Sequence, residues 1–317
     1  MKGPVPRLGI GLPVYNAERY VEQALDSILA QSFGDFELII SDNASTDRTG
    51  EMCRARAARD RRIRYYRNDR NLGAAPNFNR VFALSETEYF KFAPYDDLIE
   101  PEFLATCVRV LDADPEVVVC YTTAKIIDEH GAFVVDHDPG PDVSSPRADQ
   151  RFRRLLLERQ YALQMMGVVR SRVLRSTSLF GSFPSCDEIL LAELALRGRF
   201  HMCPERLYVY RRHPEQSTMR QATQRLRVPF FDTSLAGQIV LPTWRYLMAS
   251  LGAVKSAPIS RVEKGRCYAH VARWMLVPPH FRALGKDVLL AFRAAAARSG
   301  GRSEGSVGVS GGGGAAR

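Results

Sequence analysis

Acidic side chains cluster at two places where apolar runs end. Asp42 follows the run 36–41 and opens the polar segment 42–47, and Asp96 and Asp97 follow the run 89–93. Two carboxylates about 4 Å apart repel by about 4 kcal/mol at an effective dielectric constant of about 20, unless a cation or a proton compensates them. Mg²⁺ and Mn²⁺ prefer carboxylate oxygens and share their shell with substrate phosphates. The pattern therefore predicts a metal–diphosphate site at Asp96 and Asp97, with Asp42 placed for a nucleoside.

Each acidic segment also has a purely structural interpretation. Asp42 and Asp47 can form turns or cap a helix, and Asp96 with Asp97 can form another capped turn. We favour the functional interpretation because both segments follow strands of one predicted sheet. The glycine patterns of a dinucleotide fingerprint and of a P-loop are absent from the sequence, which excludes those two ways of binding phosphate.

Short apolar runs alternate with helical patterns over the first 122 residues. Such alternation predicts βαβ units and therefore an α/β fold with a mostly parallel sheet flanked by helices. Ligands of such sheets bind beyond the carboxyl ends of the strands. The predicted strands are 8–12, 36–41, 63–66, 89–93 and 117–121, and the predicted helices are 17–31, 49–59, 75–84 and 101–112.

The pattern changes after residue 122, and we divide the chain into 1–122, 123–219, 220–297 and 298–317. The second part is predicted to hold a hairpin over 126–135, a loop over 139–146, helices at 151–160, 171–176 and 187–197, and short strands near 168 and at 207–210. The third part is a helical C-terminal extension with helices at 239–251, 261–276 and 281–297. The glycine-rich fourth part is predicted to be a disordered tail.

Composition narrows the function classes. The chain has 317 residues, is 45% hydrophobic and 25% charged, and has no apolar run long enough for a transmembrane helix. Its six cysteines are scattered, which predicts reduced, buried thiols and a cytoplasmic location. The net charge of +9 is concentrated after residue 219. Aromatic residues rarely interleave with the arginines, so nucleic-acid binding is not expected.

Three segments carry a family resemblance. GLPVYNAERYVEQALDSILAQSFGDFELIISDNASTDRT, then Arg70-Asn71-Leu72-Gly73, then YFKFAPYDDLIEPEFL, resemble the nucleotide-binding half of an inverting family 2 glycosyltransferase with the GT-A fold. The resemblance covers residues 8–217. It implies metal-dependent transfer of a sugar from a nucleoside diphosphate sugar to an acceptor hydroxyl, with Mg²⁺ or Mn²⁺ as cofactor. Among nucleotide sugars, the resemblance favours a UDP- or dTDP-sugar as the donor. The implied acceptor is a saccharide, a lipid-linked molecule or a small molecule.

The resemblance also assigns the donor site. In this family the metal motif corresponds to Asp96 and Asp97, but Pro94 stands where many members have their first aspartate. Which of the two carboxylates is the direct ligand stays open. His213, in the segment YVYRRHP, would be a metal ligand or would donate to phosphate. The residues implied for nucleotide binding are Pro13, Tyr15, Asn16, Asp42, Asn71 and Asp96.

The acceptor side follows from a second motif. An acidic residue at a helix start is the catalytic base of many members, and Asp187 matches that position. Cys186 replaces the glutamate that often precedes this residue, so Glu188 is a competing candidate. These departures leave open the alternative of a catalytically impaired nucleotide-sugar-binding module.

The basic C-terminal helices have three possible roles. They can pack on the catalytic body, which we favour, or mediate a homodimer. They can also make peripheral contact with the inner face of the membrane.

Overall fold

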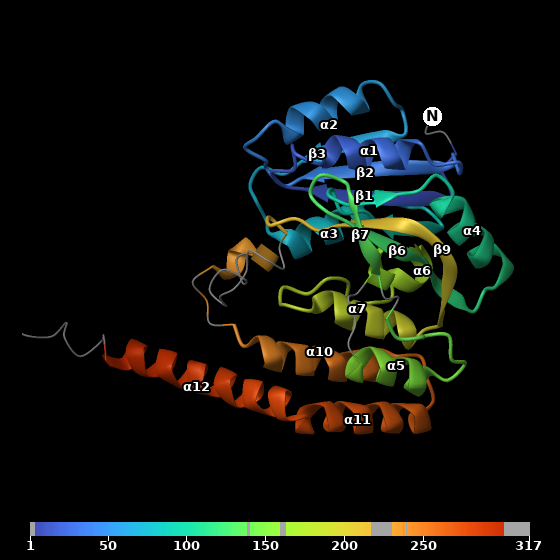
Figure 1. Ribbon diagram of the computed structural model, residues 1–317. Coiled ribbons are helices and arrows are strands. Elements are labelled where there is room, and N and C mark those ends of the chain that lie inside the picture. The colour runs from blue at the N-terminus through green and yellow to red at the C-terminus, as the bar shows by residue number, and fades with distance from the viewer. Residues whose placement is uncertain are drawn as a thin grey trace, which may run out of the picture.

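A single mixed sheet organises the computed structural model, which describes residues 4–137, 140–158, 163–216, 230–236, 238 and 240–300 (Figure 1). The strand order is β3-β2-β1-β4-β8-β6-β9-β5, and β7 pairs with β6. The strands are β1 (Leu8–Val14), β2 (Phe36–Asp42), β3 (Ile63–Arg67), β4 (Tyr89–Phe92), β5 (Leu98–Ile99), β6 (Val117–Ile127), β7 (Phe133–His137), β8 (Val168–Arg170) and β9 (Arg199–Arg211).

Helices cover both faces of the sheet and continue beyond it, which confirms the predicted α/β architecture. They are α1 (Val21–Leu29), α2 (Thr49–Ala57), α3 (Ala74–Ala83), α4 (Phe103–Ala113), α5 (Ala148–Leu157), α6 (Ser171–Leu174), α7 (Cys186–Ala195), α10 (Pro242–Ser256), α11 (Arg261–Leu276) and α12 (Pro278–Gly300). Two short 3-10 helices lie at Leu163–Met166 and Thr233–Leu235.

The first half of the sheet is parallel because helical crossovers connect its strands. β1 pairs with β2 on one side and with β4 on the other, and β2 pairs with β3, all in parallel. β1 is buried along its whole length. One face of β1 is apolar at Leu8, Ile10 and Leu12, whereas the opposite face is glycine. A Cβ at Gly11 would lie 2.5 Å from a Val81 methyl group, so this glycine lets α3 pack directly on the strand.

The second half of the sheet differs from the sequence prediction in strand length. β6 runs on to Ile127 and pairs antiparallel with β7, which confirms the predicted hairpin. β9 begins at Arg199 and pairs parallel with β6, although only 207–210 was predicted as strand. Several side chains between Arg199 and Arg206 are exposed, so the segment lacks the apolar signature of a buried strand.

The C-terminal helices pack on the rest of the chain, as favoured from the sequence. α10 and α11 bury Leu247, Val254 and Val271 against Phe152 of α5 and Ile189 of α7. α12 extends to Gly300, beyond the predicted end at 297, and the rest of the predicted tail lies outside the described residues. The six cysteines are free and buried, as predicted. Within the described residues, the helices are too short or too polar to cross a membrane.

Candidate active site

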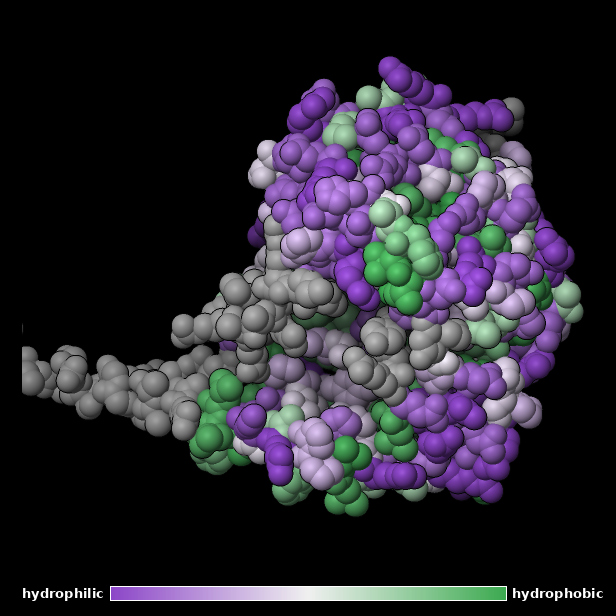
Figure 2. Space-filling model, viewed as in Figure 1, coloured by the Kyte–Doolittle hydropathy of each residue, from purple (hydrophilic) through white to green (hydrophobic). Residues whose placement is uncertain are grey.

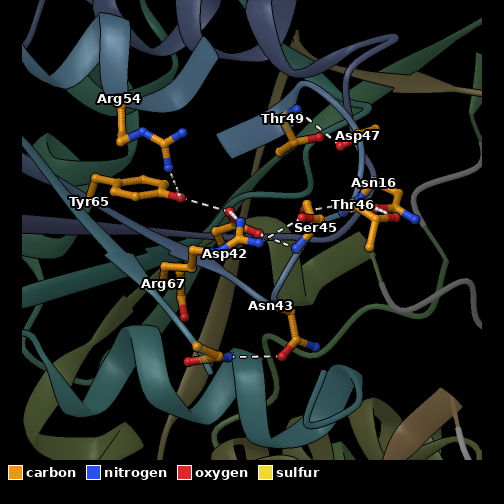
Figure 3. Close-up of polar contacts among 12 residues, drawn as sticks. Asn16, Asp42, Asn43, Ser45, Thr46, Asp47, Thr49, Arg54, Tyr65 and Arg67 are labelled. Atoms are coloured by element: carbon orange, nitrogen blue, oxygen red, sulfur yellow. Dashed lines mark hydrogen bonds and ion pairs between the residues drawn. The ribbon is translucent and has the colours of Figure 1, made fainter. Parts of the chain in front are cut away.

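A hydrogen-bonded cluster surrounds Asp42 at the end of β2 (Figure 3). The carboxylate is fully buried and accepts hydrogen bonds from Ser45 N at 2.8 Å, Tyr65 Oη at 2.7 Å and Arg67 Nη1 at 2.5 Å. Burial alone would raise the pKa of Asp42. The hydrogen bonds from Ser45 and Tyr65, together with the Arg67 charge, lower it on balance. Asp42 is therefore an ionised anchor that fixes Tyr65 and Arg67, and its own oxygens are occupied by protein donors.

The loop after β1 is tied to the loop after β2. The Asn16 backbone N–H donates to Ser45 Oγ at 3.0 Å, and its side-chain Oδ1 accepts from the Thr46 N–H at 2.9 Å. Asn16 has φ of 49°, a conformation that asparagine tolerates better than most residues. Tyr15 is 41% exposed beside it, whereas Pro13 is buried inside β1 opposite Ser41. Of the nucleotide residues expected in this loop, Tyr15 offers an open aromatic face and Asn16 holds the loop.

A hollow of about 680 Å³ opens beside the Asp42 cluster. Its lining includes Ser45, Thr46, Asp47, Arg48, Arg54 and Arg67. Gly50 also lines it, and a Cβ at this position would lie 2.9 Å from Asp42 Oδ2. Glycine therefore allows α2 to begin directly over the cluster.

Asn71 lies in the loop between β3 and α3. Its Oδ1 accepts from Asn43 Nδ2 at 2.8 Å and from the Gly73 N–H at 2.8 Å. Its carbonyl oxygen accepts from Thr233 Oγ1 at 2.8 Å. Asn71 thus holds this loop against the end of β2 and against the segment 231–236.

The two carboxylates after β4 have different surroundings. Asp97 is buried, accepts from Tyr208 Oη and accepts from the Arg211 N–H at 2.9 Å. Burial and the neighbouring Asp96 charge raise the pKa of Asp97. Asp96 is 16% exposed, and its Oδ2 lies 3.0 Å from Nε2 of His213, which is 1% exposed. The Asp97 carboxylate is thus held by donors of β9, whereas the partly exposed Asp96 carboxylate contacts the imidazole of His213.

Arg211 fixes the segment that carries His213. Its side chain is buried, donates to the Asp96 carbonyl at 3.0 Å and donates to Gln23 Oε1 of α1 at 2.6 Å. The guanidinium also lies 4.7 Å from the centre of the Tyr20 ring, which in turn packs 4.8 Å from the His213 ring. The end of β9 is therefore held over the Asp96–Asp97 turn.

The Asp96–His213 pair fits a divalent cation that completes its shell with substrate. Carboxylate oxygen and imidazole nitrogen are both ligands for Mn²⁺ and related ions. In the described part of the chain, the side chains do not gather three or more His, Cys, Asp or Glu residues in one metal-binding group. Two protein ligands leave positions for diphosphate oxygens and water, as is usual for Mg²⁺-type sites.

Asp187 and Glu188 begin α7 after the loop 181–185. Burial raises the pKa of Asp187, and burial together with the Asp187 charge raises the pKa of Glu188. Glu188 Oε2 accepts from Tyr246 Oη of α10 at 3.3 Å. Glu188 is thus hydrogen-bonded to α10, and among the described residues Asp187 forms no side-chain hydrogen bond with that helix.

The segment 231–236 contacts both the loop that carries Asn71 and the loop before Asp187. Asp232 Oδ2 accepts from Ser182 Oγ at 2.8 Å, in the loop before Asp187. The Thr233 N–H donates to the Leu72 carbonyl at 3.2 Å, next to Asn71. Nearby, Asn79 Nδ2 of α3 donates to the Phe180 carbonyl at 2.9 Å. These contacts bring the loop before Asp187 next to the loop that carries Asn71.

Sequence reasoning missed the residues that hold the site together. Tyr65 and Arg67 were not predicted as site residues, although both donate hydrogen bonds to Asp42. Tyr208 and Arg211 lie in the segment YVYRRHP, of which only His213 was predicted as a site residue, and both donate hydrogen bonds to Asp97. Their partners lie 23 to 114 residues away along the chain, so no local spacing could identify them.

Comparison with known protein families gives a match over residues 10–177, to the model described as "Glycosyl transferase family 2". An uncharacterized protein of Mycobacterium tuberculosis (strain ATCC 25618 / H37Rv) is 30% identical over 275 residues, covering 86% of this chain and 73% of that protein. Chondroitin synthase of Escherichia coli is 29% identical over 130 residues, covering 41% of this chain and 19% of the synthase.

Among solved structures, Staphylococcus aureus TarS 1-349 in complex with UDP-GlcNAc is similar to this chain with a TM-score of 0.63 and 18% identity. The likeness covers 90% of this chain and 81% of the TarS chain. At this level of identity it establishes a shared fold.

Proposed function

The chain belongs to glycosyl transferase family 2, and we propose that it moves a sugar from a nucleoside diphosphate sugar to an acceptor hydroxyl with inversion at the anomeric carbon. The observation that carries this proposal is the Asp96–His213 pair. The resemblance matches Asp96 to the family's metal motif, and the Asp96 carboxylate lies 3.0 Å from His213 Nε2, whereas the Asp97 carboxylate accepts hydrogen bonds from Tyr208 and Arg211. We therefore assign Asp96 and His213 as the metal ligands, with Asp97 as the residue that positions the turn.

The donor's nucleoside fits the edge formed by Tyr15, Asn16 and the Asp42 cluster. The exposed Tyr15 ring supplies a stacking face for the base. Arg67, fixed by Asp42, supplies a donor at the wall of the neighbouring hollow. A uridine or thymidine diphosphate sugar is the proposed donor, and the UDP-GlcNAc bound to the structurally similar TarS supports a uridine nucleotide.

When bound by Asp96 and His213, Mg²⁺ or Mn²⁺ would supply positive charge against the charge that develops on the departing diphosphate. The protein adds its own contribution there. The Arg211 side chain donates to the carbonyl of Asp96, its backbone N–H donates to the Asp97 carboxylate, and Tyr20 packs against the His213 ring. The ligand pair is therefore preorganised by buried contacts.

Asp187 is the proposed general base. Its carboxylate takes the proton of the acceptor hydroxyl while that oxygen forms a bond to the anomeric carbon. The bond to the diphosphate oxygen breaks at the same time, and its electron pair leaves with the nucleoside diphosphate. One displacement inverts the configuration without a covalent sugar–enzyme intermediate. The raised pKa of Asp187 supports this role, because a base is most effective when its pKa lies nearer the working pH.

We also propose where the acceptor is recognised and where in the cell the protein works. We expect acceptor specificity in the segment 136–147, since segments at the rim of such sites often carry it; residues 138 and 139 of this segment lie outside the described part of the chain. The acceptor is proposed to be a saccharide, a lipid-linked molecule or a small molecule. A cytoplasmic location is proposed on the six free thiols.

A donor screen tests the proposed function. The full chain is incubated with a panel of nucleotide sugars and Mn²⁺, and nucleoside diphosphate release is measured with and without EDTA. We expect release from at least one donor that EDTA abolishes and that excess Mn²⁺ restores. Donor binding by calorimetry without turnover on water or on any acceptor would instead identify a catalytically impaired nucleotide-sugar-binding module.

A further inference from the structure

Two helices form the outermost layer of the C-terminal region. α11 turns Cys267, Val271 and Trp274 inward, toward α5 and α10. α12 packs against α10 through Leu284 and Asp287, whose Oδ2 accepts from the Thr243 N–H at 2.9 Å. The opposite sides of both helices therefore point away from the sheet, along the lower edge of the molecule (Figure 1).

This outer side exposes large apolar side chains. Val262 and Leu276 of α11 are 66% and 76% exposed, and they lie on one line because fourteen residues make about four turns. Phe281 and Phe292 of α12 are 66% and 70% exposed, with Leu289 half-exposed between them. Figure 2 shows hydrophobic side chains at the lower edge of the molecule, over these two helices. We name this surface, built on Val262, Leu276, Phe281 and Phe292, the docking face.

The same surface is cationic. Arg273, Arg282 and Lys286 are exposed there and form no ion pair within the described residues, whereas Arg266 lies 3.9 Å from Asp149. The two acids of α11 and α12 over residues 261–292 are both engaged elsewhere. Glu263 closes the capping box with Ser260, and Asp287 is buried against α10. The docking face thus combines exposed apolar side chains with positive charge that the described residues do not neutralise.

We propose that the docking face lies on an anionic lipid bilayer. Apolar side chains flanked by Arg and Lys along surface helices match the interfacial zone, where the rings enter the acyl boundary and the cations meet lipid phosphates. A second copy of the chain is a poorer occupant, because a two-fold interface would bring the same cations face to face. The inference does not depend on the proposed sugar transfer.

Vesicle sedimentation tests the proposal on the full chain. Sucrose-loaded vesicles of phosphatidylcholine alone are compared with vesicles that also contain phosphatidylglycerol, at low and high salt. We expect the protein to sediment with the anionic vesicles at low salt and to be released at high salt, which shortens the Debye length. Arg273→Gln/Lys286→Gln should weaken binding about 30-fold, because each cation near the surface contributes about fivefold. Phe281→Ser/Phe292→Ser should weaken it by about tenfold or more.

A matched variant controls for net charge. Arg59→Gln/Arg61→Gln removes two exposed cations near the end of α2, on the far side of the molecule, and should bind vesicles like the wild type. Thermal unfolding of each variant verifies that it is folded. The proposal is overturned by equal binding to neutral vesicles, by an equal loss in this control, or by no sedimentation at all. It is also overturned by a second outcome: light scattering shows a dimer that Phe281→Ser/Phe292→Ser dissociates, and the wild type does not bind vesicles.

Discussion

Replacing Asp187 with asparagine should lower the rate of sugar transfer without lowering the stability of the fold. The amide would keep the shape of the side chain but could not accept the proton of the acceptor hydroxyl. A general base contributes about 10²–10⁴-fold, which corresponds to about 2.7–5.4 kcal/mol in the barrier. We therefore expect the transfer rate of Asp187→Asn to fall by that factor while donor binding, measured by calorimetry, stays at the wild-type level.

The same variant should be at least as stable as the wild type at neutral pH. Burial raises the pKa of Asp187 in the folded chain above its value in the unfolded chain, so ionisation at neutral pH disfavours folding. Below the unfolded pKa both states carry the proton and the penalty is absent. The difference in melting temperature between Asp187→Asn and wild type should therefore grow as pH rises from about 4 through the raised pKa of Asp187 in the folded chain. As pH is lowered, the wild-type transfer rate should fall when Asp187 becomes protonated. The midpoint of this fall should lie above the pKa of an ordinary aspartate.

Glu188→Gln is the control for this experiment. It alters a hydrogen bond from Tyr246 and removes one charge next to Asp187, while the proposed base remains. We expect its rate to stay well above that of Asp187→Asn. If Glu188→Gln lost activity by the full factor and Asp187→Asn kept it, Glu188 would be the base and our assignment would be wrong.

Three further changes test the architecture. Asp42→Ala should lower the free energy of unfolding by about 3 kcal/mol in urea denaturation, because three donors lose a buried carboxylate; a loss below about 1 kcal/mol would contradict its anchoring role. Gly73→Ala should cost about 2 kcal/mol or more by the same measurement, since φ is +93° and a Cβ would lie 2.7 Å from Asp232 N; an unchanged midpoint would argue against the contact between these segments. Burial lowers the pKa of Lys91 to about 7, so the unfolded state binds more protons above this pH. Wild-type stability should therefore rise relative to Lys91→Met by about 1 kcal/mol per pH unit between about pH 7 and 9, and parallel pH profiles would refute this.

The sequence predicted the elements whose patterns are local. The apolar runs at 8–12, 36–41 and 89–93 are buried strands, because sheet and helices cover them on both faces. β5 and the first half of β9 were missed. β5 has only two residues, and β9 exposes several of its side chains, so neither shows the period of a buried strand.

The sequence motifs predicted which segments form the candidate site, but they did not predict the hydrogen bonds that hold its side chains in place. Asp42 was expected to face a nucleoside, but the fold buries it and leaves Arg67 and Tyr15 on the open side of the cluster. The choice between Asp96 and Asp97 depends on Tyr208 and on the backbone of β9, more than 100 residues later. These contacts depend on the order of strands in the sheet, in which β9 pairs antiparallel with β5. The spacing of residues in a single sequence does not reveal that order.

The most direct test of the central claim is the binding of Mn²⁺ in the presence of a nucleoside diphosphate. Free Mn²⁺ is followed by electron paramagnetic resonance while the full chain is titrated with UDP, dTDP and GDP in parallel. We predict one bound Mn²⁺ per chain with at least one nucleotide, lost in Asp96→Asn and His213→Ala and kept in Asp136→Asn, whose carboxylate pairs with Arg206 on β9. Unchanged Mn²⁺ binding in Asp96→Asn would contradict the account.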